Sequence, residues 1–151
     1  MKKHNKQNGF TLIEILVVIG IIAILAAVVI IAINPARQFA QARNSQRSSN
    51  VNAILNAVWQ RMVDNKGVWD NDCGLGVGND VDLPGVASQI GTGGVDIAAC
   101  VVPTYLPSMV WDPTTGDAVN AGYYISQDVG GRITVSAPDT EIATTDISVT
   151  R

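Results

Sequence analysis

One long apolar stretch constrains this chain more than any other feature. From Phe10 to Ile33 the sequence runs for 24 residues with a single charge, Glu14, and its last 19 residues carry none. About 20 apolar residues in a helix span the hydrocarbon core of a bilayer. The stretch holds 17 large apolar residues, each favouring insertion by roughly 0.3–0.6 kcal/mol, against a cost of roughly 3 kcal/mol for one acidic residue. The sequence therefore predicts a membrane-spanning helix.

The C-terminal part is acidic and poor in catalytic groups. Residues 64–151 contain 12 acidic and 3 basic residues, a net charge of −9, which repels phosphate and argues against nucleic acid as the main partner. His4, the only histidine, precedes the apolar stretch, so no histidine is present downstream as a general base or zinc ligand. We expect no enzyme. A tethered enzyme that uses only aspartate pairs is the one catalytic alternative.

A short motif stands directly before the apolar stretch. Residues 9–14 read GFTLIE and follow a leader that contains Lys2, Lys3 and Lys6. This arrangement resembles the prepilin leader of type IV pilins and type II secretion pseudopilins. The resemblance implies that a prepilin peptidase removes the leader, residues 1–9, by cutting between Gly9 and Phe10, and then N-methylates Phe10. The apolar helix would be kept.

Glu14 is the exception within the apolar stretch. A lone carboxylate in hydrocarbon costs several kcal/mol unless it is paired or protonated. Glu14 lies four residues after Phe10, so it could pair with the α-amine that cleavage creates, in its own or a neighbouring subunit, and would then be an assembly determinant. The alternative is that Glu14 snorkels to the interface or favours a helix N-terminus.

The helical pattern continues beyond the membrane segment, residues 10–33. Asn34-Pro35 predicts a kink, because proline removes one helical hydrogen bond, and residues 34–67 then read as an amphipathic helix. One face of it carries apolar residues at helical spacing: Val51, Ile54, Leu55, Val58 and Met62. Arg43, Arg47 and Arg61 flank this face. They could meet acids of the next subunit, bind anionic lipid, or be solvated.

Residues 68–151 predict a small head. Segments 123–127, 132–136 and 147–149 alternate apolar and polar residues, and a glycine-rich turn joins the first two, as in antiparallel strands. Residues 68–122 read as a long loop with short pieces such as 95–99. The fold class is α+β, with the long N-terminal helix packed on a three-stranded sheet. The Asp112-Pro113 to Gly116 region is similar to the Asp-Pro-x-Gly region of major pseudopilins.

Two features of the head could stabilise it. Cys73 and Cys100, the only cysteines, either form a disulfide that contributes about 3–4 kcal/mol through loop entropy or remain thiols. The resemblance to major pseudopilins also implies a calcium site in the C-terminal loops, for which Asp112, Asp117 and Asp139 are the candidates. Solvated acidic loops are the alternative, and we expect no other cofactor.

The resemblance, together with the apolar helix, implies a structural subunit of a type IV pilus-like or type II secretion pseudopilus filament. Its expected partners are further copies of itself in a helical filament, the prepilin peptidase, the membrane and an inner-membrane assembly platform. The precursor would cross the inner membrane once with its head extracytoplasmic, and would then enter a periplasmic or cell-surface filament. Long pili, secretion pseudopili and DNA-uptake filaments share this leader. The alternative function is a tethered binding module that presents residues 68–103 to a ligand without polymerising.

Overall fold

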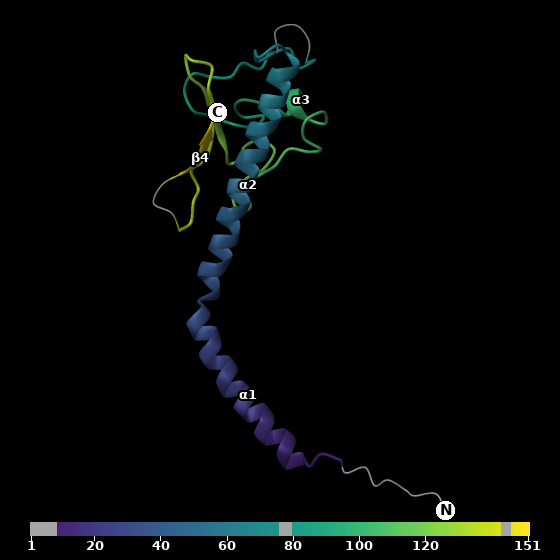
Figure 1. Ribbon diagram of the computed structural model, residues 1–151, viewed down its shortest axis with the longest axis vertical. Coiled ribbons are helices and arrows are strands. Elements are labelled where there is room, and N and C mark those ends of the chain that lie inside the picture. The colour runs from purple at the N-terminus through teal and green to yellow at the C-terminus, as the bar shows by residue number, and fades with distance from the viewer. Residues whose placement is uncertain (1–8, 76–79, 143–145) are drawn as a thin grey trace, which may run out of the picture. The chain divides into compact units, whose positions relative to one another are not determined.

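The computed structural model describes residues 9–75, 80–142 and 146–151, and the chain divides into two compact units, Met1–Gln38 and Phe39–Arg151. The first unit contains helix α1 (Leu12–Ile33), and helix α2 (Pro35–Asp64) starts there and continues into the second. The second unit also holds the short helix α3 (Ala98–Val101; Figure 1). The four strands found in the described residues lie in this unit as well. This arrangement is of the α+β class, as the sequence predicted.

Asn34 separates the two long helices. It has φ 48° and ψ 79° and is the C-cap of α1, a left-handed conformation that asparagine adopts more readily than most residues. Its side-chain oxygen accepts the N–H of Arg37 at 3.4 Å, so it also caps the start of α2, where Pro35 has no N–H to leave unpaired. The sequence predicted a kink. The structure instead has one helix that ends at Ile33 and a second that begins at Pro35.

Helix α2 supplies one side of the core. Its predicted apolar face is buried along with Ala57 and joins a cluster of sheet and loop residues. Gly67 has φ 87° and donates its N–H to the carbonyl of Met62 at 2.7 Å, which closes the helix end at the glycine that the sequence favoured as a cap.

The sheet is antiparallel, with strand order β1-β2-β3-β4. Its strands are β1 (Ser88–Gln89), β2 (Tyr124–Gln127), β3 (Ile133–Ala137) and β4 (Ile147–Thr150). The three predicted strands are present within one residue of their expected ends, and β3 alternates between buried and half-buried residues. The two-residue strand β1 was missed, because alternation cannot be recognised over two residues.

The connection between α2 and β2, described for residues 65–75 and 80–122, is built into the core, although most of it was predicted to be a loop. This segment contains β1 and α3 (Ala98–Val101), and its apolar residues Ile90, Ile97, Val101, Leu106 and Met109 are buried. Ile90 donates to the Tyr123 carbonyl at 2.8 Å, which fixes the segment to the edge of the sheet. The core therefore lies between α2, the sheet and this long connection.

Candidate functional site

The predicted cleavage point lies in open backbone. Gly9, Phe10 and Thr11 precede α1 outside any regular element, and the Phe10 residue is 85% exposed. A Cβ added at Gly9 would meet no atom within 4 Å. Residues 1–8 of the leader lie outside the described residues. The Gly9–Phe10 bond, which lies at the start of the described residues, is therefore accessible to a peptidase.

Thr11 and Glu14 together start helix α1. The Glu14 N–H donates to Thr11 Oγ1 at 3.3 Å, while Glu14 Oε2 accepts the Thr11 N–H at 2.8 Å and its hydroxyl at 2.7 Å. This reciprocal pattern is a capping box, which satisfies helix donors that have no intrahelical partner. The motif that precedes the apolar stretch thus also fixes where the helix begins.

The capping box occupies the Glu14 carboxylate, which was predicted to pair with the α-amine of Phe10. In the sequence with its leader, Phe10 N belongs to the peptide bond with Gly9, so the α-amine exists only after cleavage. The structure shows the Glu14 carboxylate bound by Thr11. Pairing between Glu14 and the α-amine stays a prediction for the processed chain, and the roles of Gly9 and Phe10 in cleavage and methylation likewise stay predictions.

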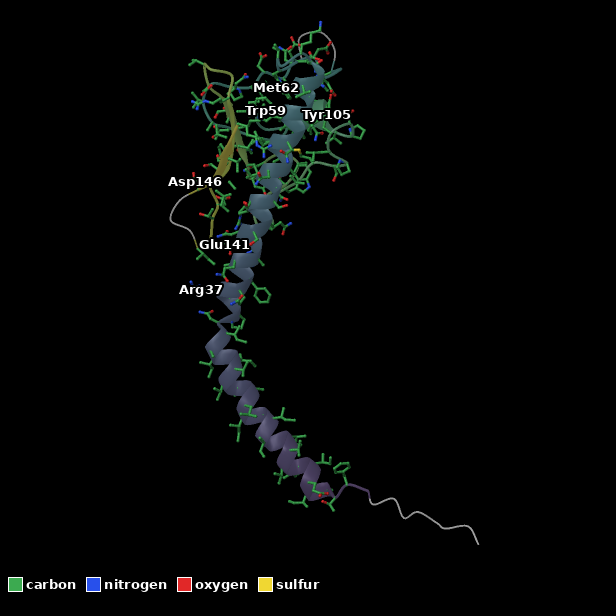
Figure 2. The ribbon with its side chains drawn as sticks, viewed as in Figure 1. Arg37, Trp59, Met62, Tyr105, Glu141 and Asp146 are labelled. Carbon is green, nitrogen blue, oxygen red and sulfur yellow. A yellow bond between two sulfur atoms is a disulfide. The ribbon has the colours of Figure 1, made fainter. Side chains whose placement is uncertain are left out.

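Helix α1 has the properties of a membrane anchor. Its 22 residues are long and apolar enough to cross a bilayer, with a mean hydropathy of 3.5 over the best window. None of these residues, all of which the structure describes, is buried. Figure 2 shows its mostly apolar side chains projecting around the ribbon. Apolar area on this scale requires a membrane or another apolar surface.

A second polar cluster centres on Arg47, inside the compact unit Phe39–Arg151, which we call the head from here on. This residue is fully buried, and its Nε and Nη2 bind the two oxygens of Asp112 at 2.6 and 3.1 Å. Its remaining hydrogen bonds go to Asn44, Glu141 and Thr114 at 2.8–2.9 Å. The guanidinium has five N–H donors, and these contacts use all of them. We call Arg47, Asp112, Glu141 and Arg43, which also pairs with Glu141, the arginine cluster.

The charges of the arginine cluster stabilise one another. Burial opposes ionisation of Asp112, but hydrogen bonds from Arg47, Thr114 and Thr115 outweigh it and hold the pKa of this carboxyl well below its usual value. Hydrogen bonds from Arg43 and Arg47 lower the pKa of Glu141 to about 2. Hydrogen bonds to Asp112 raise the pKa of Arg47, against the opposing effect of its burial. The cluster is therefore fully charged at neutral pH.

The three arginines that the sequence singled out all bind groups of their own head. Arg61 donates to the Asp70, Asp72 and Cys100 carbonyls and pairs with the Asp70 carboxylate at 3.2 Å. From the sequence, these arginines were expected to meet acidic groups of the next subunit, to bind anionic lipid or to be solvated. The contacts within the head correct that expectation. The sequence did contain an indication that Arg47 is buried. It precedes Val51, Ile54 and Val58 by four, seven and eleven residues, and this helical spacing places it on the same buried face.

The calcium candidates are engaged in local hydrogen bonds. Asp112 binds Arg47, Asp117 accepts the N–H groups of Val119 and Asn120, and Asp139 accepts the Thr115 hydroxyl at 2.8 Å. Across residues 9–75, 80–142 and 146–151, no group of three or more His, Cys, Asp or Glu side chains is placed to hold a metal ion. A calcium site thus has no geometric support in this part of the chain, and calcium binding itself stays a prediction.

Cys73 and Cys100 form a disulfide with Cα atoms 4.5 Å apart. It joins the loop after α2 to helix α3, close to the point where Arg61 Nη1 donates to the Cys100 carbonyl at 3.1 Å. The long connection is therefore fastened to the end of α2 both covalently and by hydrogen bonds.

Comparison with known families gives a match at the N-terminal end of the chain. Residues 4–33 match the family described as "Prokaryotic N-terminal methylation motif", a segment that contains the Gly9–Phe10 bond, the capping box and helix α1. Comparison with curated proteins and with solved structures gave no match. The motif supports a pilin- or pseudopilin-type protein that is anchored in the membrane as a precursor and is a substrate of prepilin peptidase.

Proposed function

We propose that this chain is a structural subunit of a type IV pilus-like or type II secretion pseudopilus filament. One observation carries the proposal: the methylation motif, residues 4–33, coincides with helix α1, and the described chain buries none of that helix. A membrane can cover an apolar helix before assembly, and the helices of neighbouring copies can cover it afterwards. The assembly would be a helical homo-oligomer.

The mechanism follows from the order of the segments. Prepilin peptidase cuts between Gly9 and Phe10 and methylates Phe10, while α1 holds the subunit in the inner membrane with its head outside the cytoplasm. An assembly platform in that membrane then gathers subunits, and Glu14 pairs with the terminal amine of a neighbour. The head covers the filament surface and performs no catalysis. The finished filament is periplasmic or lies on the cell surface.

Mass spectrometry of the chain isolated from its native membrane tests the processing step. We expect a polypeptide that begins at Phe10 and carries one added methyl group. A Gly9→Val variant should keep its leader, because a branched side chain then stands beside the scissile bond. Gly20→Ala is the matched control, since Gly20 lies within α1 and also has open space around it. An intact leader in the wild type, or loss of the whole apolar helix, would contradict the proposal.

Electron microscopy of the same cells tests assembly. We expect filaments that contain the processed chain and that disappear with the Gly9→Val variant. A chain that is correctly processed and yet stays dispersed in the membrane would instead support the tethered binding module, the alternative function. The two experiments together separate a failure of processing from a failure of polymerisation.

A further inference from the structure

The head contains a pocket that filament assembly does not explain. It lies at the end of α2, has a volume of about 550 Å³, and is lined by α2, the segment that follows it and the β2–β3 turn. The α2 residues Trp59 and Met62 contribute from its last turns (Figure 2). Ligand pockets in proteins commonly have volumes of about 300–1,000 Å³.

The wall of this pocket is held in place, although it comes from a segment with little regular structure. Trp69 Nε1 donates to the Val81 carbonyl at 2.7 Å, and the Val81 N–H donates to the Asn71 carbonyl at 3.0 Å. Behind the wall, the Arg61 guanidinium lies 5.5 Å from the centroid of the Trp69 ring. The Cys73–Cys100 disulfide fastens the same segment. A pocket fixed in this way needs little ordering when a ligand binds.

The lining combines aromatic rings with uncharged hydrogen-bonding groups. Trp59 and Trp69 supply the rings, Asn71 and Gln127 supply amides, and Asp82 is the only charged residue among those that line the described pocket. The Asn71 amide donates to Asp82 Oδ1 at 2.7 Å, which orients both groups. Trp59 Nε1 is the one buried side-chain polar atom without a hydrogen-bond partner in the described residues.

We propose that this pocket binds a neutral saccharide, a role beyond that of a filament subunit. A pyranose presents an apolar C–H face, which suits an indole ring, and hydroxyls that both donate and accept, which suit paired amide and carboxylate groups. An anionic ligand would meet the Asp82 carboxylate and the acidic head, with its net charge of −9 over residues 64–151. A quaternary ammonium ion has no hydrogen-bond donor or acceptor to offer the amide groups of Asn71 and Gln127 in the lining.

A binding assay on the full-length chain tests the proposal. The protein is kept in a detergent without sugar head groups and is applied to an array of neutral hexose and N-acetylhexosamine oligosaccharides, sialylated oligosaccharides and an acidic peptide, with choline chloride titrated separately. The best neutral oligosaccharide is then titrated while tryptophan fluorescence is followed. Asp82→Ala and Gln127→Ala remove polar groups from the lining. Asp80→Ala is the matched control, because this exposed residue makes the same change of charge outside the pocket.

We expect neutral oligosaccharides to bind and Asp82→Ala to raise the Kd by at least about tenfold, as for loss of a hydrogen bond to a charged group. Gln127→Ala should weaken binding less, and Asp80→Ala should change the Kd by less than about twofold. Unchanged denaturation midpoints would show that the variants fold. Binding only of sialylated sugars, the acidic peptide or choline, or neutral-sugar binding that neither pocket variant weakens, overturns the proposal. The assay does not depend on polymerisation, so its failure leaves the filament role intact.

Discussion

Arg47 shows how one charged residue can order three segments of the head. It lies on the buried face of α2, reaches Asp112 at the end of the long connection, and reaches Glu141 in the segment that leads to β4. Desolvation of a guanidinium is costly, but here every donor has an acceptor. A buried ion pair of this kind changes the free energy of unfolding little while both partners are present. Removal of one partner leaves an unpaired buried charge and lowers the free energy of unfolding strongly.

Removal of Arg47 should therefore destabilise the head strongly. Arg47→Met keeps much of the side-chain volume but leaves Asp112 buried without its cation, and we expect the free energy of unfolding to fall by about 3–5 kcal/mol. Chemical denaturation of the full chain in detergent, followed by tryptophan fluorescence, measures it. Arg43→Met is the matched control, because the Arg43 side chain is 35% exposed and exposed pairs contribute little. Equal losses in the two variants would contradict this account of the cluster.

The same cluster predicts a pH dependence. The pKa of Glu141 falls from its usual value of 4.5 to about 2 in the folded head, so over this range the unfolded chain binds a proton that the folded chain does not. The free energy of unfolding should be highest above about pH 4.5 and should decrease as the pH falls toward about 2. Denaturation midpoints across this range should decline less steeply for Glu141→Gln than for the wild type. Parallel curves for the two proteins would show that Glu141 does not carry the effect.

Among the elements, the connection between α2 and β2 depends most on covalent and long-range contacts. Its cross-link joins Cys73 to Cys100, which lies in the four-residue helix α3. A helix of this length is not stable by itself. Its position comes from burial of Ile97 and Val101 and from the disulfide.

Reduction of this disulfide should lower the free energy of unfolding by about 3–4 kcal/mol, because the unfolded chain regains the freedom of the closed loop. Denaturation with and without a thiol reductant measures the difference. The double variant Cys73→Ala with Cys100→Ala should resemble the reduced wild type and should not respond to reductant. If reductant shifts the double variant as much as the wild type, the effect does not come from this disulfide.

Elements that depend on residues close together in the sequence could be predicted, whereas elements fixed by distant residues could not. Helix α1 was predicted from an almost uninterrupted apolar stretch, whereas the buried face of α2 and strands β2, β3 and β4 were predicted from local periodicity. These predictions are confirmed. Strand β1 and the course of residues 65–75 and 80–122 could not be predicted, because they are fixed by partners distant in sequence, such as the hydrogen bond from Ile90 to Tyr123. The Arg47–Asp112 pair, 65 residues apart, was missed for the same reason, although the spacing of Arg47 indicated burial.

At the scale of the whole molecule, the chain combines a head with a filled core and an apolar helix that has no buried residue. The head buries Arg47 and a contiguous cluster of apolar residues, whereas α1 leaves residues such as Ile24 and Ile31 at 68% and 83% exposure. The only charged residue in α1 is Glu14, at its start. If α1 served only as an anchor, any residue that caps the helix could replace this acid. Filament assembly through the terminal amine requires its charge.

Glu14→Gln separates these two roles, because glutamine can complete a capping box with Thr11 but cannot pair with an amine as an ion. We expect this variant to be inserted and processed normally, with filaments reduced by at least about tenfold, as for loss of one partner of a buried charge pair. Thr11→Val is the matched variant: it removes the capping hydroxyl, at a cost of about 1 kcal/mol, keeps the charge and should still form filaments. Electron microscopy counts the filaments, and mass spectrometry confirms processing. Normal filaments from Glu14→Gln would mean that the acid acts as a helix cap alone, and the stagger between subunits would then have to come from contacts between heads.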